Sequence, residues 1–248
     1  MRAILLSAGI GERLKPLTDK VQKNMLHLAG KPLLQHWIEL LKKYGINDIA
    51  INLYYLGEQI ENYFGNGEKF NVGIKYSRQE KLLGQAAAIK RIEQLYPGFC
   101  SESFLVIYAD NLTDMDIGKV VDFHKRYKPI VTITLHEHDE PWTRGIVQTD
   151  ETGRVLSFVE KPDKELVLSG KFGENPGSAG CVYVFEPEVL RNIEYDDENL
   201  GKELFPKLLN RGYKLCAFNP RAYLLDIGTI ERYEKAKKDI EEGVVRLE

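Results

Sequence analysis

The chain has 248 residues, of which 34 are Lys or Arg and 37 are Asp or Glu, so its formal net charge is −3. A chain of this length can bury about three quarters of its unfolded surface within one domain. The near-neutral charge excludes general affinity for nucleic acid or for an anionic membrane. Any recognition of phosphate must therefore be local.

The three cysteines are Cys100, Cys181 and Cys216. They are far apart, odd in number and without metal-ligand spacing, which is typical of buried thiols in a reduced compartment. Met1 leads directly into an apolar strand rather than a signal segment, and no stretch approaches about 18 apolar residues. We expect a cytoplasmic protein without a membrane partner. The oligomeric state stays open, a homo-oligomer included.

In the first half, predicted strands alternate with predicted helices. We expect strands at Ala3–Leu6, Asp48–Leu53, Val72–Ser77 and Phe104–Asp110, and helices at Pro32–Gly45, Leu56–Phe64 and Gly84–Tyr96. The first helix has Pro at its start, Gly at its end and apolar residues at helical spacing. This alternation predicts an α/β fold with a doubly wound, mainly parallel, Rossmann-like sheet.

From Pro129 onward the pattern favours β structure. Further strands are expected at Ile130–Glu137, Ala179–Phe185, Tyr213–Phe218 and Ala222–Leu225, with a hairpin at Gly145–Glu160 and helices at Pro187–Asn192, Leu200–Arg211 and Thr229–Glu242. The polar segment Lys161–Gly177 is expected to be the least regular and most mobile. No linker divides the chain, so we expect a single domain over residues 1–248.

The segment after the first strand combines small residues with cations. Ala8, Gly9 and Gly11 let a ligand approach the backbone closely, and Arg13 and Lys23 suit phosphate oxygens. The P-loop signature and the third glycine of the dinucleotide fingerprint are both missing. Two glycines alone would be typical of a surface loop. Together with the cations, they indicate a cradle for a nucleoside triphosphate.

Two acids follow apolar strands further along the chain. In open parallel sheets ligands lie beyond the carboxyl ends of the strands, which makes Asp110 and Asp226 candidates. Each acid taken alone could instead cap a helix. Two such acids beside a phosphate cradle suit Mg²⁺, which binds carboxylates together with phosphate oxygens.

The segment Leu6–Thr18, with Lys23 and Gly30–Leu33, resembles the signature of the sugar-1-phosphate nucleotidyltransferases, also called nucleotide-sugar pyrophosphorylases. The resemblance extends from Met1 to about Ala236. It implies a glycosyltransferase-A-like fold with a nucleotide-binding half at about 1–128 and an inserted β-rich, acceptor-binding region at about 129–248. The implied partners are a nucleoside triphosphate and a sugar 1-phosphate, and pyrophosphate is released.

The resemblance also implies roles for individual residues. Arg13 would hold pyrophosphate, Lys23 would bridge the two phosphates, and Lys161 would seat the sugar phosphate. The strand ending in Asp110 and the run Leu225–Thr229 are similar to family motifs, so Asp110 and Asp226 would bind Mg²⁺ as the cofactor.

The acceptor-binding motifs are present with changes. Glu160 and Lys161 resemble the family's E-K-P, in which Glu touches sugar hydroxyls. Ser178 stands where Asn usually contacts the sugar. Gly145 resembles the glycine of the usual Y-G-V, but Arg144 replaces its tyrosine. The identity of the acceptor is therefore open.

For the base, the strand–loop–helix that contains Gln79 and Gly84 resembles the family's nucleobase reader. A Gln amide can satisfy uracil or thymine and, flipped, cytosine, whereas the adjacent donors of guanine prefer a carboxylate. Gln22 and Asn24 replace the two prolines around Lys23, and we expect this loop to be less rigid as a result.

Two other functions stay open. One is a cytidylyltransferase that acts on a non-sugar phosphate, such as phosphocholine or a phosphorylated amide. The other is a catalytically silent, nucleotide-sensing regulatory subunit, against which the retained Arg13, Lys23, Asp110, Lys161 and Asp226 argue.

Overall fold

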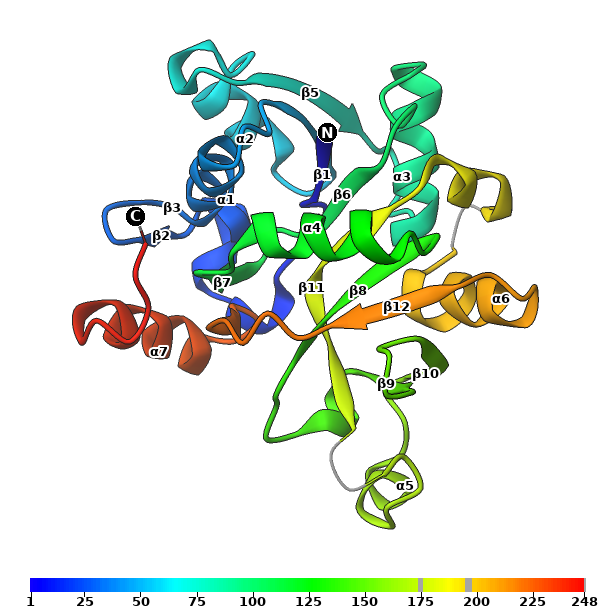
Figure 1. Ribbon diagram of the computed structural model, residues 1–248. Coiled ribbons are helices and arrows are strands. Elements are labelled where there is room, and N and C mark those ends of the chain that lie inside the picture. The colour runs from blue at the N-terminus through cyan, green and yellow to red at the C-terminus, as the bar shows by residue number, and fades with distance from the viewer. Residues whose placement is uncertain (174–175, 195–197, 248) are drawn as a thin grey trace.

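The computed structural model describes residues 1–173, 176–194 and 198–247 and is built around one large twisted sheet (Figure 1). Its parallel part consists of β1 (Arg2–Leu6), β4 (Asp48–Leu53), β5 (Gly73–Arg78) and β6 (Phe104–Tyr108). β1 lies between β4 and β6, and β5 forms the edge beyond β4. The parallel sheet predicted for the first half is confirmed.

The second half extends this sheet with antiparallel strands. They are β8 (Val131–His136), β9 (Gly145–Thr149), β10 (Val155–Glu160) and β11 (Gly177–Phe185), joined by β12 (Leu215–Phe218), which runs parallel to β8. β11 pairs antiparallel with β6 and so links the two halves. The full order is β10-β9-β11-β6-β1-β4-β5, with β8 paired to β11 and β12.

Helices cover both faces of the sheet. α1 (Leu33–Lys43), α2 (Gly57–Phe64) and α4 (Ile117–Tyr127) pack on one face, whereas α3 (Gln85–Leu95) and α6 (Phe205–Asn210) pack on the other. Because side chains alternate along a strand, Ala3 and Leu5 of β1 belong to the hydrophobic cluster under α1, α2 and α4. Ile4 and Leu6 belong to the cluster on the opposite face, under α3 and α6. Burial on both faces explains the unbroken apolar run of β1.

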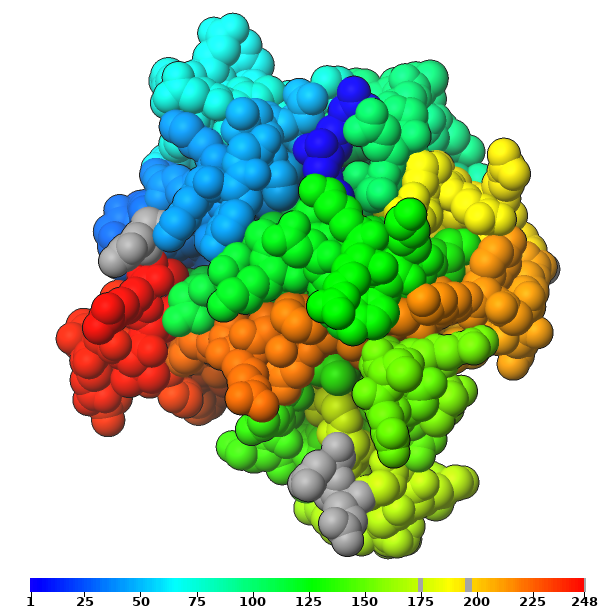
Figure 2. Space-filling view, viewed as in Figure 1, coloured from blue at the N-terminus to red at the C-terminus, as the bar shows by residue number. Residues whose placement is uncertain are grey.

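A smaller part built on β9, β10 and α5 (Lys164–Leu168) projects from the body of the molecule (Figure 2). Val167 and Phe172 pack with Ile146 of β9 into a small cluster of their own. The expectation that Lys161–Gly177 is the least regular segment is therefore wrong for residues 164–168. Residues 174–175 of that segment lie outside the described residues.

A second, two-stranded sheet brings a strand from late in the sequence beside the segment that follows β6. β13 (Leu224–Asp226) pairs with β7 (Asn111–Thr113), so that Asp226 lies opposite Asn111. α7 (Ile230–Glu241) follows and begins at the cap residue Thr229. A third small sheet joins β2 (His27–Leu28) to β3 (Lys31–Pro32).

Several connections are 3-10 turns, at Glu12–Leu14, Leu17–Asp19, Lys23–Met25, Glu68–Phe70, Pro141–Thr143 and Pro187–Asn192. The helix expected at Leu200–Arg211 is a π-helical turn, Leu200–Leu204, followed by α6. None of the described helices is long and apolar enough to cross a lipid bilayer.

Candidate active site

Lys23 lies between the two acids predicted to bind metal. It begins the 3-10 turn Lys23–Met25, and its side chain is 9% exposed. Its Nζ donates to Asp110 Oδ2 at 2.6 Å and lies 3.8 Å from Asp226 Oδ1. The β7–β13 pairing brings the two acids together, because it sets Asp226 opposite the residue that follows Asp110.

Asp110 follows β6 and is held from two sides. Lys23 contacts Oδ2, and the amide of Asn111 donates to Oδ1 at 2.9 Å. Burial raises the pKa of this carboxyl, but the charge and hydrogen bond of Lys23, helped by Arg144, outweigh burial and hold the pKa below its usual value. Asp110 is therefore ionised at neutral pH and available to a cation.

Asp226 is surrounded by arginines. Arg144 Nη2 and Arg232 Nη1 approach its Oδ2 to 3.3 and 3.1 Å. A Cβ on Gly228 would lie 2.9 Å from the same oxygen and 3.1 Å from Arg13 Nη2. A side chain at position 228 would therefore displace the end of Asp226 or of Arg13, and glycine lets Arg13 approach this cluster.

These groups line one cavity of about 430 Å³ that extends to the second half of the chain. Glu160 ends β10 within it, and a Cβ on Gly145 would lie 2.9 Å from Glu160 Oε2. A Cβ on Gly201 would collide with the same oxygen. Burial raises the pKa of Glu160 above its usual value, against the opposing charges of Lys161, Lys202 and Arg144.

Lys161 and Ser178 complete the far side of this cavity. Lys161 has a positive φ of 45°, and its N–H donates to the carbonyl of Arg144 at 3.0 Å. Ser178 is 2% exposed and is paired with Ile146 on β9 and His136 on β8. Ser178 lines the cavity with a side chain that is shorter than that of asparagine.

The glycine loop packs against the turn that carries Lys23. Gly11 has φ +75°, and a Cβ there would lie 2.9 Å from the Thr18 methyl and 3.3 Å from Lys23 Cβ. Thr18 Oγ1 also donates to the Gly11 carbonyl at 2.7 Å. Gly9 faces open space, whereas Ala8 is 7% exposed. A glycine at position 11 is thus required both by backbone conformation and by space.

The loop around Lys23 has replaced its prolines with a buried hydrogen-bond network. Gln22 is fully buried, and its amide donates to the Ser7 carbonyl at 2.8 Å and accepts from Asn24 N at 2.6 Å. Asn24 Nδ2 donates to Ser7 Oγ at 2.6 Å, and Gln22 N donates to Gln59 Oε1 at 2.8 Å. These bonds fix the backbone of the loop, so the expected loss of order has no support in this geometry.

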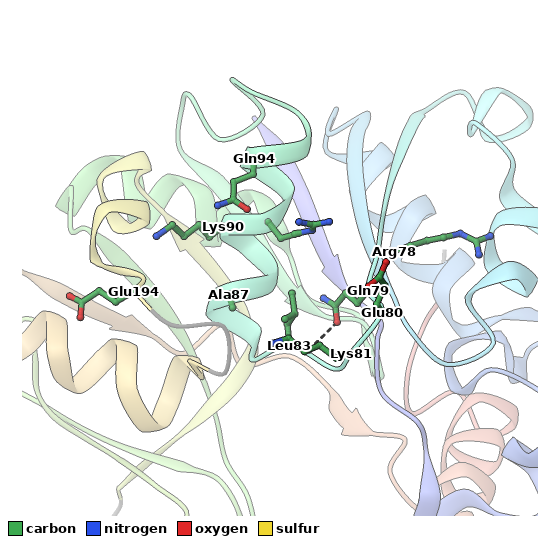
Figure 3. A pocket seen from close by; sticks show the side chains of 10 residues that line it. Arg78, Gln79, Glu80, Lys81, Leu83, Ala87, Lys90, Gln94 and Glu194 are labelled. Carbon is green, nitrogen blue, oxygen red and sulfur yellow. Dashed lines mark hydrogen bonds between the residues drawn. The ribbon is translucent and has the colours of Figure 1, made fainter.

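Gln79 lies in a different cavity, of about 950 Å³, between the loop after β5 and α3 (Figure 3). Its Oε1 accepts from Leu83 N at 3.2 Å. A backbone N–H can only donate, so this bond fixes which end of the amide is oxygen. The Nε2 donor is buried and has no partner among the described residues. Gln79 therefore offers a buried hydrogen-bond donor through Nε2.

The structure thus gathers most, but not all, of the predicted residues. The 430 Å³ cavity is lined by Arg13, Asp110, Gly145, Glu160, Lys161, Ser178 and Asp226. Lys23 is not among the lining residues but is hydrogen-bonded to one of them, Asp110. Gly84 directly precedes the lining residue Gln85 in the chain. Gln79 lines the other cavity. Sequence reasoning missed Arg232, Gly201 and Gly228, whose positions depend on tertiary pairing.

Two carboxylates are the metal-binding groups available here. No group of three or more His, Cys, Asp or Glu side chains suited to a metal occurs among the described residues. Asp110 and Asp226, both within reach of one ammonium, provide hard oxygen donors. Mg²⁺ characteristically uses one or two carboxylates and completes its shell with water and substrate phosphate, so this donor set fits it.

A parallel sheet with cations and paired acids at its carboxyl edge defines a phosphate-handling α/β protein. Comparison with known families gives the particular one: the chain belongs to the nucleotidyl transferase family, whose model matches residues 2–243. The resemblance seen in the opening segment is thereby confirmed.

Curated relatives include a UTP–glucose-1-phosphate uridylyltransferase of Synechocystis sp., 35% identical over 97% of this chain and 63% of the relative. The mannose-1-phosphate guanylyltransferase catalytic subunit beta of Xenopus tropicalis is 32% identical over 92% of this chain and 61% of the relative. The chain thus spans 61–63% of the length of these two relatives.

Solved structures share the fold. A putative glucose-1-phosphate thymidylyltransferase from Bacillus anthracis, in complex with a sucrose, superposes with a TM-score of 0.82 at 23% identity, over 96% of this chain and 94% of that one. A UDP-glucose pyrophosphorylase complexed with UDP-glucose gives 0.81 at 21% identity, over 98% of both chains. The predicted glycosyltransferase-A-like α/β fold is confirmed by this likeness.

Proposed function

We propose that this chain is a sugar-1-phosphate nucleotidyltransferase. An oxygen of the sugar 1-phosphate attacks the α-phosphorus of a nucleoside triphosphate in line, and pyrophosphate leaves. The observation that carries this proposal is the position of Lys23 between Asp110 and Asp226, two acids that line the same cavity as Glu160 and Lys161. The names of the relatives support the same reaction class.

The roles of the cations follow from charge. Arg13 holds the leaving pyrophosphate, Lys23 bridges the donor and acceptor phosphates, and Lys161 seats the sugar phosphate. Phosphoryl transfer requires positioning and neutralisation of charge rather than covalent catalysis by the protein. We assign nucleotide binding to residues 1–128, with Ala8, Gly9 and Gly11 at the phosphates, and acceptor binding to 129–248.

Asp110 and Asp226 would hold Mg²⁺. When bound, this ion neutralises charge on the phosphate oxygens of the nucleotide. Lys23, whose ammonium lies beside the same two carboxylates, would then turn toward the phosphate oxygens.

The base-recognition proposal is sharpened by Gln79. Gln79 and Gly84 belong to the segment proposed to read the base, and the free group of Gln79 is a buried donor. An unsatisfied buried donor costs about 1–3 kcal/mol, which a base carbonyl would recover. Uracil and thymine present such a carbonyl at the edge where cytosine carries an amino donor. We therefore favour UTP or dTTP over CTP.

On the acceptor side, Glu160 would accept hydrogen bonds from sugar hydroxyls, with Gly145 and Ser178 beside it. Gly145 and Gly201 leave just enough space for the carboxylate and so fix its direction. A fixed acceptor group suits a ligand with vicinal hydroxyls.

The direct test is pyrophosphate release over a matrix of CTP, UTP, dTTP and GTP against several sugar 1-phosphates and phosphorylated non-sugars. We expect release with a sugar 1-phosphate, and a loss of turnover of at least about 100-fold in Arg13→Ala and Asp110→Ala with the fold retained. Lys125→Ala, exposed on α4, is the matched control. Release only with CTP and a non-sugar acceptor would favour a cytidylyltransferase, and no release from any pair would favour a silent regulatory subunit.

A further inference from the structure

Arg144 lies at the junction of the acceptor strands. The 3-10 turn Pro141–Thr143 ends at this residue, whose extended backbone (φ −126°, ψ 173°) leads into β9. Its carbonyl accepts from Lys161 N at 3.0 Å. The backbone of Arg144 is thus held by the same strand pair that carries Glu160, and its side chain lines the 430 Å³ cavity.

The guanidinium of Arg144 is only lightly engaged. Its Nη2 lies 3.3 Å from Asp226 Oδ2, an oxygen that Arg232 approaches more closely, at 3.1 Å. Lys23 lies 3.8 Å from the other oxygen of the same carboxylate. Asp226 therefore has cationic partners without Arg144. Among the residues that the structure describes, the bond to Asp226 is the one hydrogen bond made by the guanidinium of Arg144, and an arginine has five N–H donors, so most of its donors have no partner there.

The charge of Arg144 acts on acids at both ends of the cavity. Burial is the largest influence on the pKa of Asp110 and on that of Glu160 and raises both, whereas Arg144 lowers both. Asp110 belongs to the end assigned to metal and nucleotide, and Glu160 to the end assigned to the sugar. The geometry agrees: the side chain of Arg144 contacts Asp226, and its backbone carbonyl is bonded to Lys161, the neighbour of Glu160, so Arg144 joins the metal acids to the acceptor motif within one cavity.

Building on that proposed function, we propose that Arg144 is a further catalytic residue, which donates to the nonbridging oxygens of the phosphoryl group under transfer. A bond forms between the acceptor phosphate oxygen and the α-phosphorus, while the bond from the α-phosphorus to the pyrophosphate oxygen breaks. Pyrophosphate leaves with that electron pair. Arg144 remains protonated and moves no proton. Its effect is to neutralise charge that develops on the phosphoryl oxygens.

This role adds to the residues of the family signature, which has tyrosine at the position of Arg144. The nucleoside triphosphate and the sugar phosphate together bring about six negative charges at neutral pH. Arg13, Lys23 and Lys161 are balanced in number by Asp110, Asp226 and Glu160. An additional guanidinium beside the metal acids therefore supplies charge neutralisation that the signature residues alone do not.

The test compares Arg144→Ala and Arg144→Lys with the control Arg154→Ala. Arg154 is exposed and directly precedes β10. With the best substrate pair of the wild type, we expect kcat to fall at least about 100-fold in Arg144→Ala. The KM for the nucleotide should change by less than about threefold. Arg144→Lys should recover only part of the rate, because an ammonium lacks the planar fork. Added methylguanidinium should raise the kcat of Arg144→Ala and should not raise the kcat of the wild type or of the other variants.

Retention of kcat within about threefold by Arg144→Ala, while the wild type is active, would overturn the role of Arg144 and leave the proposed function standing. A loss confined to KM would also overturn it, because Arg144 would then contribute to ground-state binding only. If Arg144→Ala does not fold, the Arg144→Lys variant decides, and full activity there contradicts the proposal. Absence of pyrophosphate release by the wild type with every pair would reject both proposals.

Discussion

The ammonium of Lys23 lies 2.6 Å from Asp110 Oδ2 and 3.8 Å from Asp226 Oδ1. One cation thus occupies the space between the two carboxylates that are proposed to bind metal. Because the same lone pairs would serve a divalent ion, the two cations compete. Metal should therefore bind weakly to the free protein and more tightly once phosphate oxygens draw Lys23 away.

The first prediction concerns this competition. Lys23→Met should bind Mn²⁺, used as a spectroscopic substitute for Mg²⁺, about tenfold more tightly than the wild type in the absence of nucleotide, a gain of about 1.4 kcal/mol. Electron paramagnetic resonance titration of free Mn²⁺ measures the change. Lys31→Met, which removes a lysine paired with Glu39 outside the cavity, is the control. Equal or weaker Mn²⁺ binding by Lys23→Met would contradict the competition.

The second prediction concerns the pH dependence of acceptor binding. Burial raises the pKa of Glu160 above its ordinary value of 4.5, so this carboxyl gains its proton at a higher pH than an exposed glutamate. The ionised form is the one that accepts from sugar hydroxyls. As pH falls through the raised pKa, kcat/KM for the acceptor should fall, whereas Asp110, whose pKa is lowered, stays ionised.

Steady-state rates across the acidic range measure this decline. Glu160→Gln should have a lower kcat/KM for the acceptor and should lose the acidic decline, because an amide does not titrate. Persistence of the same decline in Glu160→Gln would assign it to another group.

The third prediction concerns the network behind Lys23. Gln22→Ala removes a buried amide and leaves the Ser7 carbonyl and Asn24 N–H without their partner. The free energy of unfolding should fall by about 1–3 kcal/mol. Gln22→Pro suits the backbone φ of −60° but should also destabilise, because it removes the N–H bonded to Gln59. Urea denaturation measures both changes. Gln94→Ala, exposed on α3, should have little effect, and an equal loss there would undermine the assignment.

The fourth prediction concerns base preference. Gln79→Glu retains an oxygen for the Leu83 N–H but loses the buried donor. We expect kcat/KM for UTP or dTTP to fall by about 10- to 100-fold, equal to about 1.4–2.8 kcal/mol, with a smaller change for GTP because a carboxylate suits the guanine donors. Equal losses with all nucleotides would indicate damage to the loop rather than altered recognition.

The sequence predicts the parallel half of the fold well because its strands are buried on both faces and therefore form continuous apolar runs. It misses α4, although this helix has 11 residues, as many as α1 and α3, which are predicted. The available signal is Asp116, whose side chain accepts from Lys119 N as an N-cap, followed by buried Ile117 and Val120. It also misses α5, because a five-residue helix covered mainly by one small cluster leaves little periodicity to detect.

For the site, strand ends and motif spacing single out Asp110, Asp226, Lys23 and the Glu160–Lys161 pair. They do not predict that two arginines meet at Asp226, since Arg144 directly precedes β9 and Arg232 lies in α7. Nor do they predict how Gln22 and Asn24 replace proline. Side-chain amides stabilise the turn through Ser7, which follows β1, and Gln59 of α2, and such contacts are visible only after folding.

The pairing of β13 with β7 has a consequence for biosynthesis. Asp110 is made well before its partner Asp226, which follows it in the chain by 116 residues (226 − 110). Strands β1, β4, β5 and β6 can associate earlier, because their contacts lie within the first half. A nascent chain can therefore acquire its parallel core while still unable to assemble the paired carboxylates, which come together only after Asp226 has been made.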